Sequence, residues 1–267
     1  MERIKVALEK ARQNRERNPS TTPEKLASSL EETRAPASPA EISYSRTRVV
    51  EVPPDRLRSN RIVAAHPQSP YADAFKILRT QILQRMKENG WKTLAVTSPN
   101  AGEGKTLTAL NLAASMAMEI SHTVLLVDTD LREPGVAGLL GIDGDRGLAD
   151  YLLDDAPLEE LLVHPEPLDH LVVLPAGRSV INSAELLNSP NMAQLVQDLR
   201  NRYPERIVVF DLPPVLQAAD ALAFAPNVDA ILLVFEEGRT SQEDAQRTVE
   251  LLEGHAIIGT VLNKAAT

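Results

Sequence analysis

The segment from Thr93 to Met118 limits the possible folds of this chain more than any other part of the sequence. It begins with a short apolar run typical of a buried strand, continues through a turn that contains Gly102 and Gly104, and ends in a helix rich in alanine and leucine. Lys105 stands at the start of that helix. A phosphate group needs several N–H donors aimed at one point, and a loop that runs into a helix N-terminus provides them together with the positive end of the helix dipole. The order of strand, turn and helix therefore predicts a phosphate-binding loop.

Each residue type in this loop has a physical task. Glycine lets the backbone approach the anion, the Lys105 ammonium is expected to reach the β- and γ-phosphates, and the Thr106 hydroxyl is expected to bind Mg²⁺. The usual pattern G-x-x-x-x-G-K-[ST] has glycine where this chain has Pro99. The alternative is a surface turn before a helix, but the strand-to-helix context of G-E-G-K-T favours a phosphate site. The predicted ATP-binding residues of the loop are Asn100, Ala101, Gly102, Glu103, Gly104, Lys105, Thr106 and Leu107.

Composition excludes several classes of function. The formal net charge of the 267-residue chain is -9 and its isoelectric point is about 5.2, which argues against broad nucleic-acid binding. The chain has no cysteine, which excludes disulfides, thiolate zinc sites and a cysteine nucleophile. No apolar run reaches the roughly 18–20 residues of a membrane span, and the charged N-terminus lacks the apolar region of a secretory signal. We therefore expect a cytoplasmic protein, with any recruitment to the inner face of the membrane made through a partner.

Three regions follow one another along the chain. Residues 1–17 have the composition of an amphipathic helix, which is either a docking helix that orders on a partner or a frayed, solvated helix. Residues 18–59 form the second region, which we expect to be a mostly disordered linker because most of it is rich in Pro, Ser, Thr, Ala and Glu. Residues 47–52 of that region can form a short extended segment. We expect residues 60–267 to form one folded domain.

Within this domain, apolar segments alternate with helical ones. Strands that are apolar at every position are buried on both faces, so the alternation predicts an α/β fold with a mostly parallel central sheet flanked by helices. Ligands of such folds bind beyond the carboxyl ends of the strands. The expected strands are 94–96, 123–128, 171–174, 206–211, 230–235 and 257–262. The expected helices are 72–86 (with an apolar face of Ala74, Ile77, Leu78, Ile82 and Met86), 107–118, 147–153, 158–163, 183–187, 192–203, 218–224 and 241–253.

Two of the expected strands end in aspartate. Asp128 ends one, with Asp130 two residues later, and Asp211 ends another. At the edge that holds the phosphate-binding loop, an aspartate can hold Mg²⁺ directly or through water, or accept a proton from a nucleophile. A single aspartate there is more often an N-cap or a loop carboxylate, but two such strand ends beside G-E-G-K-T favour a Mg·ATP site. We assign Thr106, Asp128 and Asp211 to the metal and Lys105, Asp128 and Asp130 to catalysis, with Asp128 as the base near the incoming hydroxyl and Asp130 assisting.

These motifs resemble those of the bacterial tyrosine kinases. The segment from Asp128 to Arg132 is similar to the family's D-x-D-x-R motif, and the segment from Phe210 to Pro214 is similar to its h-D-x-P-P motif. Residues 146–152 and 175–187 are similar to its G-L-x-D-x-L turn and its P-A-G…N-P-A-E-L-L stretch. The resemblance covers residues 60–264 and implies the P-loop fold of the MinD/ParA ATPases and phosphoryl transfer from Mg·ATP to tyrosine. The N-terminal region also resembles the leaders of soluble, CpsD- and CapB-like versions from exopolysaccharide (exosortase-linked) loci.

The resemblance also implies partners and one more contact to the nucleotide. In the family an E-x-x-R-x-x-R helix mediates oligomer contacts, and here the matching positions are Asp73, Lys76 and Arg79. Kinases of this family are switched on by the cytoplasmic tail of a membrane polysaccharide chain-length regulator, which implies a role in capsular or exopolysaccharide biosynthesis and export. Asn263 sits where relatives hydrogen-bond the adenine; the alternative reading of Asn263 is a strand-ending turn.

Two departures from the family's pattern keep two functions open. Asn100 stands where the MinD/ParA ATPases have a lysine, which favours the kinase branch. The chain lacks the C-terminal tyrosine cluster that these kinases autophosphorylate, and its four tyrosines are scattered. Tyr44 is either a substrate or an ordinary exposed residue. The first hypothesis is a protein-tyrosine kinase, and the second is a MinD-like, ATP-dependent assembly switch without tyrosine kinase activity.

Overall fold

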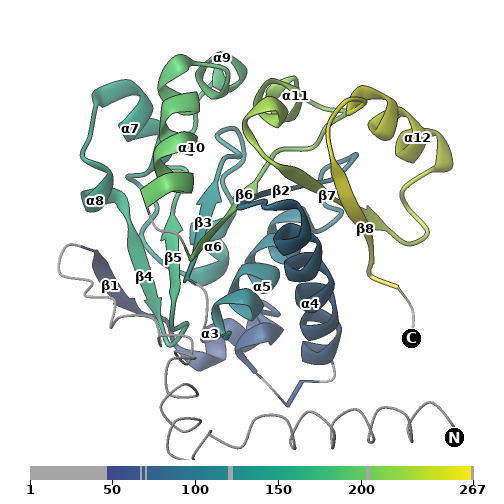
Figure 1. Ribbon diagram of the computed structural model, residues 1–267. Helices are drawn as coiled ribbons and strands as arrows, with labels where there is room; N and C mark the ends of the chain where they lie inside the picture. Colours follow the sequence, from purple (N-terminus) through teal and green to yellow (C-terminus); the bar gives the residue numbers. More distant parts are fainter. Residues whose placement is uncertain (1–46, 67, 70, 120–122, 203–204, 266–267) are drawn as a thin grey trace, which may run out of the picture. The chain divides into compact units, whose positions relative to one another are not determined.

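A computed structural model describes residues 47–66, 68–69, 71–119, 123–202 and 205–265 (Figure 1). The strands are β1 (Arg48–Glu51), β2 (Thr93–Thr97), β3 (Thr123–Asp128), β4 (Val163–Glu166), β5 (Leu171–Leu174), β6 (Arg206–Asp211), β7 (Ala230–Glu236) and β8 (Ile257–Asn263). The helices are α3 (Pro54–Ser59), α4 (Ala72–Asn89), α5 (Lys105–Ala117), α6 (Val136–Leu140), α7 (Leu148–Asp154), α8 (Leu158–Leu161), α9 (Ser183–Leu187), α10 (Pro190–Arg202), α11 (Asp220–Phe224) and α12 (Gln242–Leu251), with short 3₁₀ helices η1 (Val63–Ala65) and η2 (Ala225–Asn227).

The strands form one sheet in the described residues, in the order β1-β4-β5-β3-β6-β2-β7-β8. Every neighbouring pair is parallel except β4 and β5. The register of β3 against β6 places Asp128 directly opposite Asp211. The mostly parallel α/β fold predicted from the sequence is therefore confirmed, and the two strand-ending aspartates are neighbours at one edge of the sheet.

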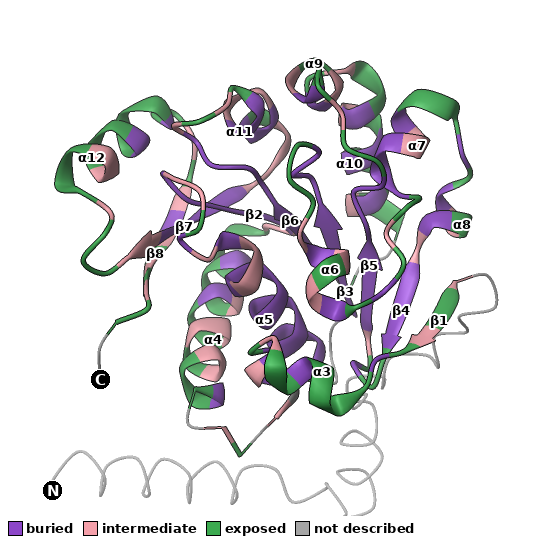
Figure 2. Cartoon of the chain, turned by 180° about the vertical axis from the view of Figure 1, so that it is seen from behind, coloured by how far each residue is buried: buried purple, intermediate pink, exposed green. Residues whose placement is uncertain are grey.

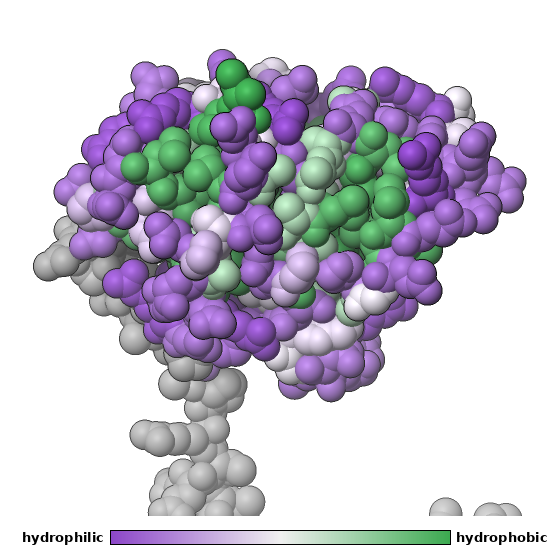
Figure 3. Space-filling model, turned by 90° about the horizontal axis from the view of Figure 1, so that it is seen from above, coloured by the Kyte–Doolittle hydropathy of each residue, from purple (hydrophilic) through white to green (hydrophobic). Residues whose placement is uncertain are grey.

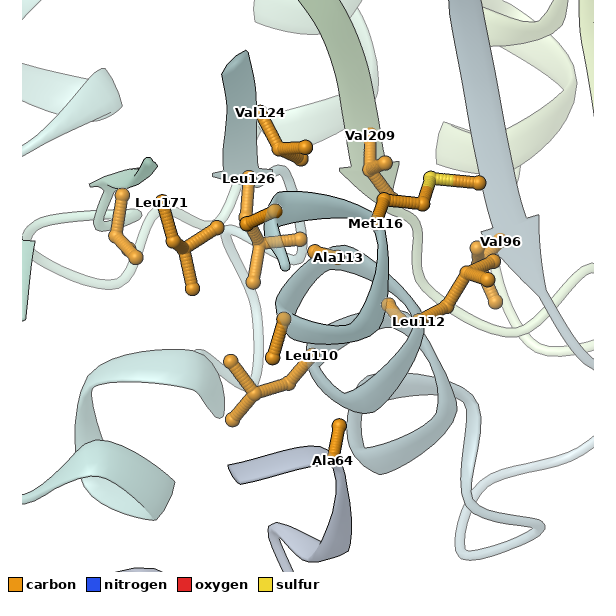
Figure 4. Packing of buried hydrophobic residues seen from close by; sticks show 14 of the residues in the cluster. Ala64, Val96, Leu110, Leu112, Ala113, Met116, Val124, Leu126, Leu171 and Val209 are labelled. Atoms are coloured by element: carbon orange, nitrogen blue, oxygen red, sulfur yellow. The ribbon is translucent and has the colours of Figure 1, made fainter. Parts of the chain in front are cut away.

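Helices cover both faces of the sheet, because the strands are apolar on both sides. One apolar cluster joins alternate strand side chains to α4, α5 and α6, and a second joins the other strand side chains to α7, α8, α10 and α11. Figure 4 shows α5 lying among the side chains of Val96, Leu126 and Val209, which come from three different strands. The central strands and α5 are buried along their lengths, while the outer helices expose one face (Figure 2). This double packing holds the loop between β2 and α5 on a rigid base.

The folded unit includes residues 48–59, which composition assigned to the linker. β1 pairs with β4, and both Val52 and Leu57 are buried at 1% exposure in the core cluster. The Arg56 Nη2 atom donates to the Gly138 carbonyl at 3.0 Å, which ties α3 to α6. The boundary at residue 60 is wrong because two buried apolar side chains are enough to anchor a polar, proline-containing segment. The predictions for residues 1–17 and for the linker up to residue 46 lie outside the described residues.

Two smaller predictions were also wrong, and one short helix between β3 and α7 was missed. The helix expected at 158–163 ends at Leu161, and the next residues form β4 instead, where the extended chain gains partners on both sides. The short helix α6 was not predicted. Ala74 and Ile77, expected on the core face of α4, are exposed, with Ile77 at 61%, because α4 buries only its Ala72, Ile82 and Met86.

We expect Leu57→Ala to lower the free energy of unfolding by about 2–5 kcal/mol, because it removes a fully packed side chain from the core. Urea unfolding followed by circular dichroism measures this change. Val49→Ala in neighbouring β1 is the control, because Val49 is 48% exposed and its truncation should cost no more than about 0.5 kcal/mol. Equal, small effects of both substitutions would mean that residues 48–59 are a linker after all.

Candidate active site

The phosphate-binding loop lies between β2 and α5, at the carboxyl edge of the sheet. Gly102 and Gly104 have φ angles of +81° and +96°, a backbone conformation that side chains with a Cβ rarely adopt. A Cβ on Gly104 would also collide with the amide nitrogen of Asn263. The segment that follows β6 holds the main chain of the loop, since the Leu216 N–H donates to the Pro99 carbonyl at 3.1 Å. The sequence thus requires glycine at both turn positions, and the proline that departs from the usual pattern forms part of the loop's support.

The side chain of Glu103 holds the loop together from inside. It is fully buried; its Oε2 accepts from the Asn100 N–H at 2.9 Å and its Oε1 accepts from the Thr240 hydroxyl at 2.6 Å. Only the main chain of Glu103 can therefore face a bound phosphate. Sequence reasoning missed Thr240, because it comes from the β7–α12 connection and only the pairing of β2 with β7 brings it to the loop.

Lys105 is the centre of an ion cluster. Its Nζ atom lies 2.7 Å from an Asp130 carboxylate oxygen and 3.7 Å from one of Asp211, and it donates to the Thr106 hydroxyl at 3.1 Å. Burial lowers the pKa of Lys105, but the charges of Asp211 and Asp130 outweigh it, so the pKa lies above its ordinary value. The ammonium is therefore charged, and the carboxylates hold it where a phosphate group can compete for it.

Asp211 carries a buried carboxylate that pairs with the Lys105 ammonium at 3.7 Å but accepts no hydrogen bond from the part of the chain that the structure describes. The side chain is fully buried and neither oxygen has a hydrogen bond at ordinary distance within the described residues. Its nearest groups are the Lys105 ammonium and the Thr106 hydroxyl. Burial raises the pKa of Asp211 despite the nearby Lys105 charge. A buried, unsatisfied carboxylate costs free energy, and a hydrated Mg²⁺ between Asp211 and Thr106 would satisfy it with the oxygen ligands that this ion prefers.

The small number of protein ligands that this site offers also fits magnesium. No group of three or more acidic or histidine side chains in the described part of the chain could hold a metal by itself. Magnesium does not need such a cage, because in nucleotide sites it takes one or two protein ligands and completes its shell with water and phosphate oxygens. Asp211 and Thr106 meet that requirement. The third predicted metal ligand, Asp128, is already engaged in hydrogen bonds to the main chain.

The Asp128 carboxylate is hydrogen-bonded to the main chain, and its pKa is raised. Its Oδ2 accepts from the Gly135 and Val136 N–H groups, each at 3.0 Å, and its Oδ1 accepts from the Asp130 N–H at 3.2 Å. Asp128 therefore holds the turn that leads into α6. This is the role of a loop carboxylate, which the sequence offered as the alternative to a site residue. Burial, and then the neighbouring Asp211 charge, raise the pKa of Asp128 to about 7. A carboxylate with that pKa is matched to accepting a proton near neutral pH.

The end of β8 supports the loop from the other side. The Asn263 side-chain amide donates to the Glu103 carbonyl at 2.9 Å, and the Lys264 ammonium donates to the Gly102 carbonyl at 2.9 Å while pairing with Glu236. Lys264 has a φ of +58°, so a turn does follow the strand. Adenine recognition by Asn263 stays a prediction. Arg239, to which sequence reasoning assigned no role, also lies against Gly102.

An open groove of about 1650 Å³ runs from the loop along α4 and β8. Gly104 and Leu107 line it near the phosphate end, and the exposed side chains of Tyr71, Ile77 and Leu262 line it further away. The groove was not predicted, because it needs the edge strand β8 and the exposed face of α4 to lie side by side. It is large enough for the rest of a nucleotide and for part of a partner.

Comparison with known proteins relates this geometry to characterised relatives. Residues 91–253 match the family model described as an AAA domain. The tyrosine-protein kinase YwqD of Bacillus subtilis is 33% identical over 210 residues, which cover 78% of this chain and 87% of YwqD. The succinoglycan biosynthesis transport protein ExoP of Rhizobium meliloti is 34% identical over 212 residues, which cover 78% of this chain but only 26% of ExoP.

Several solved structures have the same fold as this chain. The kinase domain of the Escherichia coli tyrosine kinase ETK superposes with a TM-score of 0.70 at 28% identity, over 77% of this chain and 82% of that domain. The chimerical protein CapA2B2 has a TM-score of 0.73 at 28% identity, over 78% of this chain and 91% of the other. The septum site-determining protein MinD of Pyrococcus horikoshii, solved with Mg-ADP, has a TM-score of 0.53 at 24% identity over 64% of this chain and 69% of the other, which shows a shared fold.

The raised pKa of Asp128 predicts how the stability of the nucleotide-free protein depends on pH. Because the folded state keeps a proton on Asp128 up to about pH 7 while the unfolded chain releases it near its ordinary pKa of 3.8, this group makes folding less favourable as pH rises between these values. Relative to Asp128→Asn, the wild type should lose free energy of unfolding by up to ~1.4 kcal/mol per pH unit in that window. Urea unfolding of both proteins at pH 5, 6, 7 and 8 measures the difference. Curves that stay parallel across this range would show that Asp128 titrates normally.

Proposed function

The chain belongs to the family of bacterial tyrosine kinases with an AAA domain, and on that premise we propose that it transfers the γ-phosphoryl group of Mg·ATP to tyrosine. The observation that carries the proposal is the buried Lys105 ammonium between Asp130 and Asp211, directly below a glycine loop that opens a helix. Such a site works by positioning the phosphates and stabilising their charge. The product phosphotyrosine would regulate capsular or exopolysaccharide biosynthesis and export, in keeping with the name of the relative ExoP.

Each residue of the cluster has a task in this reaction. The loop N–H groups around Gly102 and Gly104 bind the phosphates, and Lys105 leaves its carboxylate partners to neutralise the charge that develops on the β- and γ-phosphoryl oxygens. Thr106 and Asp211 would hold Mg²⁺, and the ion would supply positive charge to the phosphate oxygens. Asp128 accepts the proton of the tyrosine hydroxyl, and Asp130 orients Lys105. Asn100, Ala101, Glu103 and Leu107 contribute main-chain contacts, and Asn263 contributes the adenine contact.

A second candidate function is an ATP-dependent assembly switch that hydrolyses ATP without phosphorylating tyrosine. It is favoured by the small number and dispersed positions of the four tyrosines in the sequence. Tyr71 is 60% exposed at the start of α4, and Tyr151 is half-buried in α7. Tyr44 and Tyr203 lie outside the described residues. Phosphotransfer is preferred because the chain aligns with most of YwqD, whose name is that of a tyrosine kinase.

We also propose a membrane partner and a cytoplasmic site of action. None of the described helices is both long and apolar enough to cross a bilayer. The relative ExoP is named as a transport protein, and one similar structure is a CapA2B2 chimera. The cytoplasmic tail of a polysaccharide chain-length regulator would therefore act in trans on this chain, bringing it to the inner face of the membrane. Nucleic acid is not proposed as a partner.

Self-association through α4 is proposed on the residues that α4 exposes. Asp73 and Lys76 form an ion pair at 2.8 Å on the helix surface, with Ile77 exposed beside them. Arg79 is different, because it donates to the Ser115 carbonyl at 2.7 Å and approaches Glu119, which secures α4 to α5. A contact between copies would therefore use Asp73 and Lys76 directly, while Arg79 would act by positioning the helix.

Lys105→Met should abolish phosphoryl transfer, because no other cation is held against the phosphate position by two buried carboxylates in the described residues. Two quantities are measured: the transfer of label from γ-labelled ATP to protein tyrosine, and the release of labelled phosphate. Both reactions contain a peptide with the sequence of the chain-length regulator's cytoplasmic tail. Lys87→Met removes an exposed lysine of α4 and serves as the matched control. Full turnover by Lys105→Met would refute the site, whereas phosphate release without phosphotyrosine in the wild type would support the assembly switch.

Removing the charges of Asp73 and Lys76 together should weaken any self-association of the chain. Light scattering coupled to size-exclusion chromatography compares the mass of the wild type with that of Asp73→Asn/Lys76→Gln at the same concentration. Glu88→Gln, which changes an exposed charge on the last turn of α4, is the control. An oligomer that survives the double substitution, or a wild type that is monomeric at high concentration, would contradict this interface.

A further inference from the structure

Arg132 is held in an unusual way beside the proposed site. Its Nε atom donates to the Ser183 hydroxyl at 3.0 Å and to Asp220 at 3.3 Å. Asp220 is fully buried, whereas the Arg132 side chain is 47% exposed. No hydrogen bond from the two terminal guanidinium nitrogens is found in the described residues. The anchored Nε restricts the plane of the guanidinium, and almost half of the side chain stays accessible to solvent.

Neutralisation of Asp220 does not require this geometry. An arginine whose task is only to compensate a buried carboxylate does so best with two parallel N–H···O bonds, but Arg132 offers Asp220 a single nitrogen at 3.3 Å from each carboxylate oxygen. Ser183 then occupies the same nitrogen. This serine stands where the related kinase pattern has proline, so the second anchor belongs to this chain. The arrangement leaves free the two nitrogens that best match a carboxylate or a phosphate.

The turn that carries Arg132 encloses the phosphate-binding site. It leaves the sheet at Asp128, contacts Lys105 through Asp130, and returns at Gly135, whose Cα lies against the Thr106 side chain. Two residues of chain span at most about 7 Å, so Arg132 lies within that distance of Asp130 along the main chain. A segment whose tyrosine reached Lys105 and Asp130 would therefore pass beside Arg132 with its neighbouring residues.

An exposed apolar side chain lies in the connection that is hydrogen-bonded to the turn of this arginine. The Val180 N–H donates to the Leu131 carbonyl at 2.8 Å and the Ser179 hydroxyl donates to the Arg132 carbonyl at 2.9 Å, which fixes the β5–α9 connection to the turn. In that connection Ile181 is 90% exposed. Figure 3 looks onto the side of the molecule where α9 and α11 lie and shows separate apolar areas among mostly polar side chains. The segment that carries Ile181 is thus tied through its neighbouring residues to the turn that carries Arg132.

We propose that Arg132 and Ile181 form a subsite for the acceptor polypeptide, in which Arg132 binds a carboxylate close to the acceptor tyrosine and Ile181 contacts an adjacent aliphatic side chain. This subsite rests on the proposed function, because it names the substrate class of the tyrosine kinase reaction. That class is a tyrosine-containing segment with a carboxylate close to the tyrosine. The chain's own sequence offers a segment of this kind, with Glu41 and Ile42 just before Tyr44. Ser183 and Asp220 are positioning residues, because they act only through Arg132.

Two fluorescein-labelled peptides test the subsite directly. One has the sequence of residues 37–46, and the other is identical except that glutamine replaces Glu41. In the presence of Mg²⁺ and a non-hydrolysable ATP analogue, fluorescence anisotropy should show the wild type binding the first peptide about tenfold more tightly, as one charge-assisted hydrogen-bonded pair predicts. Ile181→Ser should weaken both peptides about equally.

The variants separate recognition from folding. Arg132→Gln/Asp220→Asn removes the fork and its buried counter-charge together, and should reduce the tenfold ratio to below about twofold without unfolding the protein. Arg200→Gln is the matched control, because Arg200 also pairs, at 2.9 Å, with a largely buried aspartate, Asp229, but at the amino end of the strands. It should keep the ratio. Ser183→Ala should give an intermediate ratio, since it removes one of the two anchors.

Several results would overturn the subsite. Equal binding of the two peptides by the wild type, no binding of either, or a ratio that survives in Arg132→Gln/Asp220→Asn would each do so. Failure of the proposed function looks different: the peptides would bind with the expected ratio, but radiolabelled phosphate from ATP would appear on neither Tyr44 nor any other tyrosine.

Discussion

The buried ammonium group of Lys105 is the interaction on which the site depends. It compensates Asp130 at 2.7 Å and Asp211 at 3.7 Å, in a place where an unpaired charge would cost several kcal/mol. Those carboxylates are together only because β3 and β6 are adjacent and in register, with Asp128 opposite Asp211. The two apolar clusters that cover the sheet therefore have a chemical consequence, since a shift of either strand would separate the lysine from its counter-charges.

The other half of the sheet holds the loop itself. β7 leads to Thr240, which bonds the buried Glu103, and β8 ends in Asn263 and Lys264, which bond the loop carbonyls. Gly104 adopts its left-handed conformation because it has no Cβ, and Asn263 leaves no room for one there. The phosphate-binding geometry is thus fixed from β3 and β6 on one side and from β7 and β8 on the other, which is the preorganisation that phosphoryl transfer requires.

The sequence predicted those parts that follow from local patterns. Continuous apolar runs identified the central strands, and G-E-G-K-T with the strand-ending aspartates identified the residues that the sheet then brought together. The sequence failed where tertiary contacts decide. β4 contains a proline and only four residues, and it forms because β1 and β5 offer partners. Residues 48–59 join the core through Val52 and Leu57, two buried side chains in a segment that is otherwise rich in charged residues and proline. The Glu103–Thr240 contact joins residues 137 positions apart, which no short motif can show.

In the proposed reaction, the charges of the site would also distinguish the nucleotide from the acceptor polypeptide. Asp130 and Asp211 both pair with the one lysine, so a triphosphate without magnesium would meet no excess of positive charge, and the cation that it brings is part of the complementarity. On the acceptor side the balance is different, because Arg132 is already neutralised by Asp220 and exerts little long-range attraction. Recognition there must depend on short-range geometry, through a planar fork held by its Nε. In the proposed reaction the nucleotide would therefore be selected by charge inside the site, and the polypeptide would be selected by shape at its edge.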